Sequence, residues 1–444
     1  MGRHAGPGRV NATGRRTRLG PFAHRGFTAF WIGGFISNIG TWLQTVAASV
    51  YVFQITGSAF AVGFLNFMSF LPVFLFSLVG GVVGDRFDRR LVVIVTHSTS
   101  VVFAAILAAV SFSGAASELE VIIIAFALNT SWAIAKPAYV SIVPAIVPKD
   151  QITEAVGLNT LQFVIGQMVG PVLAAILIAT VGVAWAFAVN ALTYLAPIVA
   201  MVYLWHLGLG GGTAAASRKR GEVKIEVVPY IRSHRWVLLL LVGVIAISAP
   251  IEIIRTLSPA LAEALGSPAG DAGLIIAAQS IGSAVALLAF IPIQRAGRAR
   301  QLAGLGLAIQ AVGIVATFLA QALAMAMVGG ALMGFGFSLC FPVLTSTLQA
   351  EVPDGLRGRV MALHQMSHLG NRPFAALAAG IAAVAIGVQP ATLIGLVLTP
   401  IGFVAARRAW RGLDADHARG AVRPAQGAPP TDVPVDPAST IAGV

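Results

Sequence analysis

The sequence has few charged residues for its length. Only 10% of its 444 residues are Asp, Glu, Lys or Arg, whereas 57% are hydrophobic. A water-soluble domain usually carries about 25% charged residues. This shortage of charge excludes a chain whose whole surface faces water. Lipid is the remaining solvent for so many apolar side chains.

Cysteine is almost absent, and so are motifs for metal or nucleotide chemistry. Cys340 is the one cysteine, so an intrachain disulfide is impossible, and its apolar surroundings predict a small buried side chain. No cluster of His, Cys, Asp and Glu has the spacing of a metal site. The glycine-rich string at 334–337 lacks the lysine of a phosphate loop. We therefore expect no metal, no cofactor and no enzymatic activity.

Long hydrophobic runs are what the sequence has in abundance. A helix needs roughly 20 apolar residues to cross the hydrocarbon core of a bilayer. Helices satisfy their own backbone hydrogen bonds in lipid, and these runs are too long for barrel strands. The sequence therefore predicts an all-α membrane protein with twelve spans, at 27–54, 58–83, 91–113, 120–146, 156–180, 183–206, 236–260, 271–293, 301–322, 324–348, 360–386 and 389–406.

A polar segment divides the twelve spans into two sets of six. The segment that starts at Val147 aligns weakly with the one that starts at Val352, and each joins the fourth and fifth spans of its half. Two parallel six-helix repeats are a transporter architecture. We predict a disordered cytoplasmic tail at 1–26, a six-helix bundle at 27–206, a cytoplasmic central loop at 207–235, a second bundle at 236–411 and a disordered cytoplasmic tail at 412–444.

Lysine and arginine gather in alternate loops. The intervening loops carry Glu118, Glu120, Glu263 and Asp271, and no Lys or Arg. Positive loops stay in the cytoplasm, so we predict a cell (inner) membrane protein with both termini cytoplasmic. The same scatter argues against nucleic acid as the partner of a chain with net charge +12. We expect a monomer whose partners are membrane lipids and a small-molecule substrate.

The loop between the second and third predicted spans carries the strongest motif, which runs from Gly81 to Arg90 as GVVGDRFDRR. It resembles the signature G-x-x-x-D-R-x-G-R-[KR] of the major facilitator superfamily, although Asp88 replaces the second glycine. The resemblance implies that the loop stabilises one state of the cytoplasmic gate, and a simple positive-inside anchor is the alternative. The implied gating residues are Gly81, Gly84, Asp85, Arg86, Arg89 and Arg90.

The fifth predicted span carries a second motif, Gly166-Gln-Met-Val-Gly170-Pro171. It resembles the antiporter motif of exporting facilitators, but alanines replace the trailing glycine pair. Pro171 removes a backbone donor and bends the helix. The alternative is ordinary kinked packing, because Gly and Pro are common in membrane helices.

Two further stretches, 30–47 and 355–363, resemble the branch of enterobactin exporters, macrolide efflux pumps and transmembrane secretion effectors. The resemblance implies the major facilitator fold and secondary active export of a drug, siderophore or metabolite by alternating access. It also implies proton antiport, with the proton gradient as energy source, and a role in drug resistance. Import or facilitated diffusion on the same fold is one alternative, and a non-transporting sensor or partner subunit is another.

Polar residues inside predicted spans are candidates for the transport site, because a charge there costs roughly 2.5–3.5 kcal/mol on insertion scales. In the family that the chain resembles, spans one, four, seven and ten line the cavity. That implies a cavity or coupling role for Asn38, Gln44, Lys136, Glu252 and Arg255.

Structural alternatives exist for these side chains. Glu252 and Arg255 are three residues apart on one helix and can neutralise each other. Lys136 can extend its stem to the inner headgroups. In span eleven, His364, His368 and Arg372 follow one another at four-residue spacing, which predicts one polar stripe. Histidine titrates near neutrality, so the stripe has either a proton or gating role or a role in polar packing.

The charge pattern makes a topology prediction. Reporter fusions in the loops at 113–119 and 263–270 should read as external, because neither loop carries Lys or Arg. Alkaline phosphatase and fluorescent protein fusions at both loops measure this directly. A cytoplasmic reading at either loop would contradict the orientation.

Overall fold

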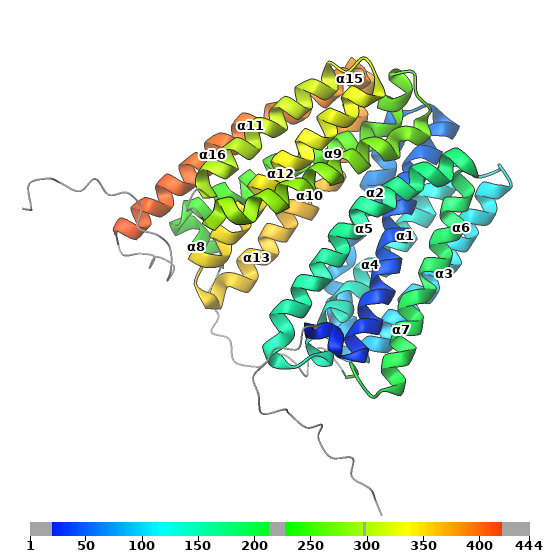
Figure 1. The fold of residues 1–444 in the computed structure, drawn as a ribbon, viewed down its shortest axis with the longest axis horizontal. Helices are drawn as coiled ribbons and strands as arrows, with labels where there is room; N and C mark the ends of the chain where they lie inside the picture. The colour runs from blue at the N-terminus through cyan, green and yellow to red at the C-terminus, as the bar shows by residue number, and fades with distance from the viewer. Residues whose placement is uncertain (1–19, 213–226, 296–298, 420–444) are drawn as a thin grey trace, which may run out of the picture.

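The structure is a computed structural model that describes residues 20–212, 227–295 and 299–419 (Figure 1). Positions 1–19 and 420–444 of the predicted disordered tails lie outside the described residues, and so does most of the basic central loop. Every regular element within them is a helix.

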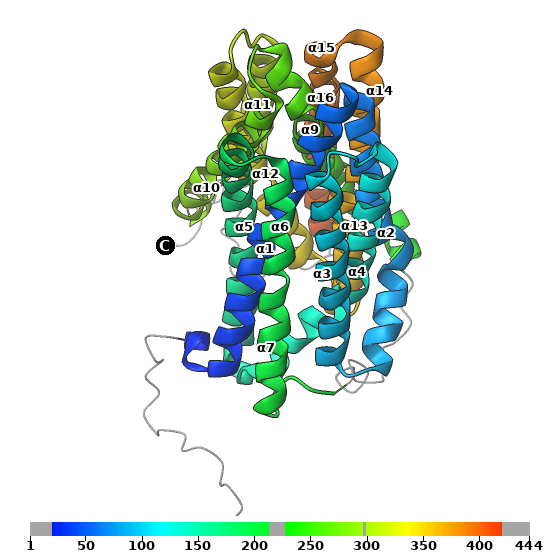
Figure 2. The same cartoon turned by 90° about the vertical axis from the view of Figure 1, so that its right-hand side faces the viewer.

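Residues 20–212 of the first half form two short 3-10 helices and seven α-helices. They are η1 (Gly20–Ala23), α1 (Arg25–Thr56), α2 (Ala59–Arg86), α3 (Arg89–Phe112), α4 (Glu118–Ile146), η2 (Lys149–Gln151), α5 (Ile152–Thr180), α6 (Val183–Thr193) and α7 (Leu195–His206). The sixth predicted span is interrupted at Tyr194, and α6 and α7 continue one another along one line (Figure 2).

The second half follows a short helix of the central loop, α8 (Val227–Ser233). Predicted span eleven is divided into α13 and α14, and span twelve into α15 and α16. The elements are α9 (Arg235–Ala264), η4 (Ala269–Asp271), α10 (Ala272–Arg295), α11 (Ala299–Phe318), α12 (Leu323–Glu351), α13 (Asp354–Leu369), α14 (Arg372–Ile386), α15 (Val388–Thr392) and α16 (Ile394–Ala418).

Eleven helical segments of the described residues are long and apolar enough to cross a membrane. The first predicted span, α1, is 32 residues long but carries several polar side chains, which lower its hydropathy. Thr41, Thr45 and Ser49 donate to the carbonyl oxygens of Ser37, Thr41 and Thr45 in the preceding turn. These bonds satisfy the hydroxyl groups within the helix. Together with α1, the helices give the predicted twelve spans of an all-α membrane protein.

The predicted disordered tails are too long at both ends of the membrane domain. Residues 20–26 form η1 and the start of α1, and the ring of Phe22 packs 5.2 Å from that of Trp31. At the other end, α16 continues to Ala418 because its charged side chains find partners on neighbouring helices. Asp414 pairs with Arg300 at 2.6 Å, and Nε2 of His417 lies 2.8 Å from Glu351.

Helix α9 is the innermost span. Buried residues make up 78% of its most apolar window, against 28–50% for the other ten segments. It contacts α16, α14, α12, α10 and α13 of its own half and α1 and α2 of the first half. A charged residue in the middle of α9, such as Glu252, is therefore surrounded by protein.

The two halves meet closely at one end (Figure 1), where α5 packs on α10 and α2 packs on α14 (Figure 2). Small residues allow this approach. A Cβ on Gly63 of α2 would lie 2.6 Å from the carbonyl oxygen of Ala376. A Cβ on Gly273 of α10 would lie 2.6 Å from that of Pro171. Both contacts lie in the halves of these helices that the charge pattern predicts to be external.

The close contact at Gly63 generates a conformational prediction. Gly63→Val should separate α2 from α14, because overpacking costs about 1–3 kcal/mol. That cost corresponds to a roughly 5- to 150-fold shift from the closed toward the open state. Ser49 is buried and lines a small cavity between the two halves. In intact cells that carry Cys340→Ala, a cysteine at position 49 should react faster with an impermeant maleimide when Gly63→Val is present.

Gly157→Val is the matched control, since a Cβ on Gly157 meets no atom within 4 Å. It should leave the labelling rate unchanged. Equal labelling in the Gly63→Val protein and its parent would contradict closure by this contact.

Candidate functional site

A carboxylate and two guanidinium groups of the second half form a central charge cluster, defined here as Glu252, Arg255 and Arg372. The first two lie on α9, and Arg372 is the first residue of α14. Glu252 and Arg372 are only 4% and 6% exposed. Nε of Arg372 lies 3.8 Å from Oε2 of Glu252. This is a buried ion pair, and removing one partner from such a pair is strongly destabilising.

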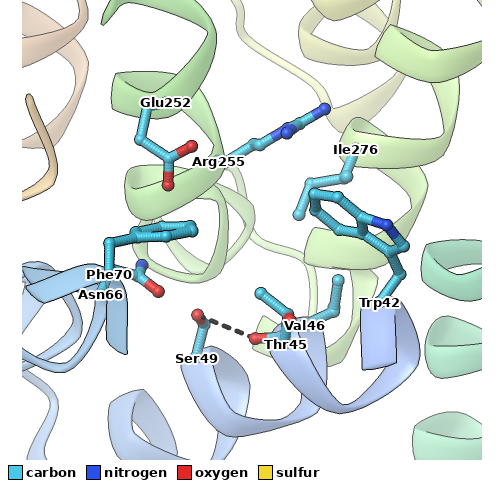
Figure 3. Close-up of a pocket in the computed structure, with 9 residues that line it drawn as sticks. All are labelled: Trp42, Thr45, Val46, Ser49, Asn66, Phe70, Glu252, Arg255 and Ile276. Atoms are coloured by element: carbon cyan, nitrogen blue, oxygen red, sulfur yellow. Dashed lines mark hydrogen bonds between the residues drawn. The ribbon is translucent and has the colours of Figure 1, made fainter. Parts of the chain in front are cut away.

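The ion pair of Glu252 is not the predicted one with Arg255. Spacing on α9 places the two residues on neighbouring turns, but their side chains leave the helix in different directions (Figure 3). Arg372 comes from a helix that sequence spacing could not relate to α9. The charge of Glu252 still acts on Arg255 at longer range.

Arg255 is bound by neutral groups from both halves. Its Nε donates to Oε1 of Gln279 on α10 at 2.8 Å. With its amide oxygen turned toward Arg255, Gln167 of α5 accepts from Nη1 at 2.9 Å and from Nη2 at 2.8 Å. The guanidinium carbon lies 5.3 Å from the ring centre of Trp42 on α1, within cation–π range. Arg255 of α9 therefore contacts α10 of its own half and α5 and α1 of the first half.

A break in the eleventh span positions Arg372. Helix α13 ends at Leu369, and α14 begins with Arg372 followed by Pro373. Proline suits the first turn of a helix, where its missing N–H would have no helical partner. Nδ2 of Asn371 donates to the carbonyl oxygens of Ser367 and His368, which belong to the end of α13. The break thus brings the guanidinium group toward α9 at low cost in backbone hydrogen bonds.

A small cavity of about 20 Å³ lies beside the charge cluster, between the two halves (Figure 3). This volume holds one or two water molecules, so the cavity itself is too small for an organic molecule. Asn66 of α2 donates to Thr256 of α9 at 3.3 Å. The lining residues are Trp42, Thr45, Val46, Ser49, Asn66, Phe70, Glu252, Arg255 and Ile276.

The other predicted polar residues of spans one and four lie outside this cavity. Oε1 of Gln44 accepts a hydrogen bond from Asn190 of α6, and both side chains are buried inside the first half. Asn38 packs against α5 at Gly166. Lys136 is exposed, and its Nζ lies 4.4 Å from the ring centre of Trp132. The structure therefore brings Glu252, Arg255 and Arg372 together and places Gln44 in internal packing.

The predicted stripe of span eleven is interrupted between His368 and Arg372 by the helix break. His364 contacts Oγ1 of Thr345 on α12 through Nε2 at 3.0 Å. His368 contacts Oγ of Ser248 on α9 through Nδ1 at 2.8 Å. Both imidazole rings pack on Phe341. These contacts fit polar packing, and a proton or gating role stays a prediction.

The antiporter-like motif forms the contact between α5 and α1. A Cβ on Gly166 would lie 2.9 Å from Cβ of Asn38, and one on Gly170 would lie 2.6 Å from Cβ of Trp42. Pro171 stands inside α5 without ending it. The glycines therefore hold Trp42 and Gln167 where both can reach Arg255.

The predicted gate loop joins α2 and α3 and is tied to the end of the first half. Nη1 of Arg89 donates to the carbonyl oxygen of Ser141 on α4 at 2.7 Å. Nη1 of Arg90 donates to that of Leu209 at 3.2 Å. Gly84 makes ordinary contact with Ala138. The gating role of Gly81, Gly84, Asp85, Arg86, Arg89 and Arg90 stays a prediction.

Asp88, which replaces a signature glycine, caps helix α3. Its φ of −59° requires no glycine, and Oδ1 accepts from the backbone N–H of Arg90 at 2.9 Å. Partial burial acts to raise the pKa of this carboxyl group. Hydrogen bonds from the Arg90 side chain and the Gly212 backbone outweigh burial, so the pKa is lowered. Asp88 thus stays ionised and connects α3 to the start of the central loop.

Sequence reasoning missed two neutral members of the site, both of them glutamines. Gln167 and Gln279 bind Arg255, while Trp42 and Phe70 face the guanidinium groups. Both glutamines are polar residues within apolar spans, a signal that could have marked them. Their hydrogen bonds to Arg255 could not be predicted, because the three residues lie on three different helices.

Solved structures share this architecture. A bacterial homolog of the human lysosomal transporter Spinster, in an inward-facing and unoccupied conformation, matches with a TM-score of 0.69 and 14% identity, over 90% of this chain and 99% of that one. A D-xylose-proton symporter matches with a TM-score of 0.63 and 16% identity, over 87% and 96%. The chain therefore has the major facilitator fold that these transporters share.

The sequence comparisons narrow this class. The chain belongs to the transmembrane secretion effector family, whose model matches residues 16–438. It is 25% identical over 403 residues to the enterobactin exporter EntS of Salmonella choleraesuis (strain SC-B67), which covers 86% of this chain and 91% of the relative. EntS of Escherichia coli O1:K1 / APEC is 25% identical over 396 residues, with coverages of 85% and 90%.

The buried ion pair generates a stability prediction. Glu252→Gln should destabilise the protein by about 3–5 kcal/mol, because it leaves a buried cation without its carboxylate. Adding Arg372→Gln should restore more stability than adding Arg255→Gln, since Arg372 is the direct partner. Thermal unfolding of the purified single and double variants in one detergent measures the coupling. Equal or better rescue by Arg255→Gln would contradict the assignment.

Proposed function

We propose that this protein is a monomeric secondary active exporter of a small organic molecule in the inner membrane, with both termini cytoplasmic. It works by alternating access and exchanges its substrate for protons. The observation that carries the proposal is the buried Glu252–Arg372 ion pair at the interface of the two halves. The export direction is supported by relatives that are named enterobactin exporters.

Glu252 is the group best placed to carry the proton. It is the one acidic side chain well inside a span in the part of the chain that the structure describes. Ionised Glu252 attracts Arg372 and so holds α14 against α9. Protonation removes that attraction and leaves a hydrogen-bonding acid. A change of charge at this position therefore alters the contact between two helices that border the interface.

The groups around Glu252 define what its protonation changes. Arg255 shares its helix, Arg372 faces it from α14, and His368 reaches α9 from α13. On the side of the first half, α1 and α2 place the neutral side chains of Trp42 and Asn66 at the cavity that Glu252 also lines. Adding one proton thus raises the positive charge of the cluster without a compensating acid among the residues that line the cavity.

Alternating access requires the closed contact to open. At the α2–α14 and α5–α10 contacts, glycines lie close to backbone atoms of the other half, and Phe67 and Phe74 contact Phe374. The ion pairs described above lie elsewhere, so these surfaces can separate without breaking them. The hydrogen bonds of Arg255 to Gln167 cross the same interface and would exchange partners during opening. The Gly81–Arg90 loop, bonded within the first half, would act at the opposite end.

Everted membrane vesicles test the coupling, because their cytoplasmic face is outward and export appears as uptake. The probes are dansylglycine, dansylglycinamide and dansylethylenediamine, which differ in charge. With an acid interior, vesicles with the wild-type protein should accumulate at least one of them. Glu252→Gln/Arg372→Gln should abolish accumulation and retain downhill equilibration of that probe, because the double change removes one negative and one positive charge, which leaves the net charge of the cluster the same, but also removes its proton carrier.

Arg300→Gln/Asp414→Asn is the matched control, since it removes an exposed ion pair far from the site. It should keep full accumulation. Undiminished accumulation by the Glu252→Gln/Arg372→Gln protein would exclude Glu252 as the coupling residue. Accumulation only with an alkaline interior would instead indicate import coupled to protons.

A further inference from the structure

We propose that the substrate is an organic anion with an apolar part, bound through Arg255 and Arg372 and attracted by Lys136. This inference rests on the proposed transport function and assigns its substrate class. It follows from the charge balance and the shape of the central site.

The centre of the protein has more cations than anions. In the described parts of the chain, Arg255, Arg372 and Lys136 lie inside spans with Glu252 as the one carboxylate. Glu252 is 3.8 Å from Arg372 and acts on Arg255 only at longer range. A buried ion costs several kcal/mol unless an opposite charge compensates it. The surplus cation therefore makes the site complementary to an added anion.

Arg255 is held in place but not neutralised. Its hydrogen-bond partners are the amide oxygens of Gln279 and Gln167, which carry no charge. Guanidinium has five N–H donors, and these bonds use three of them. The two glutamines therefore orient the planar group without matching its charge. Such a fork suits bidentate recognition of a carboxylate or a similar oxyanion.

Aromatic side chains provide the apolar part of the site. The ring centre of Trp42 lies 5.3 Å from the guanidinium carbon of Arg255 and 6.0 Å from that of Arg372. Phe70 lies 5.4 Å from the same carbon of Arg372. Val46 and Ile276 complete the apolar lining of the cavity. An anion that binds the arginines would place its carbon skeleton against these rings.

Lys136 extends the positive charge toward the predicted cytoplasmic side. It lies ten residues before the end of α4 at Ile146, which is about 15 Å along the helix. Its side chain is exposed, and its charge acts on Arg372 and His368. An anion that enters from the cytoplasm would therefore meet Lys136 before Arg255 and Arg372.

Equilibrium binding to the purified protein in nanodiscs, without a pH gradient, tests the substrate class. The probes are dansylglycine, an anion, its neutral amide dansylglycinamide, and the cation dansylethylenediamine. Dansylglycine should bind at least about tenfold more tightly than the cation, which corresponds to one favourable charge contact at the site.

Two variants locate the preference, with a third as matched control. Lys136→Gln and Arg255→Gln should each weaken dansylglycine binding several-fold and leave dansylglycinamide binding unchanged. Because Lys136 is exposed, its substitution should not affect folding. Arg300→Gln removes a cation at the exposed pair with Asp414 and should change neither probe.

Three results would overturn the substrate class: equal or tighter binding of the cation, no measurable binding of dansylglycine, or loss of the preference when chloride replaces gluconate at equal ionic strength. The last result would assign the surplus charge to an inorganic anion. Anion binding without gradient-driven accumulation would retain the substrate class and remove the coupling proposal. Gradient-driven accumulation of the cation would retain the coupling proposal and contradict the substrate class.

Discussion

The cost of holding charge inside a membrane protein is the constraint on which this structure depends. Glu252 and Arg372 are almost fully buried, and each is tolerated because the other is present. Their pairing requires α9 at the centre of the bundle and a break between α13 and α14. Arg255 adds a second cation that neutral amides hold across the interface. The charged residues whose burial costs the most free energy therefore lie where the two halves meet.

The glycines of α5 connect this site to the packing of the first half. Gly166 and Gly170 bring α5 against α1, so that Gln167 and Trp42 face Arg255 from neighbouring helices. A motif that resembles a marker of export thus has a local structural reason here. Larger side chains at either glycine would push the two helices apart and withdraw both groups from the guanidinium.

The closed contact and the charge cluster have different chemical characters. At the predicted external end, glycines approach backbone atoms of the other half, and the ion pairs described above lie outside this contact. In the proposed mechanism, the net charge of the cluster below it changes when one proton or one anion binds. A ligand that binds the cluster with different affinity in the closed and open states would shift the equilibrium between them. The contact at the external end would add little to the free-energy difference between the two states.

The sequence by itself determined the membrane class, the twelve spans and their division into halves, because lipid demands long apolar helices wherever they later pack. It also marked Glu252, Arg255 and Arg372 as costly residues. Only the tertiary structure decided which of them meet: spacing on one helix suggested Glu252 with Arg255, whereas the helix break brought Arg372 from another span. Gln44 likewise paired with Asn190 inside the first half. Periodicity describes the faces of one helix, and partners on distant helices are fixed by how those faces pack.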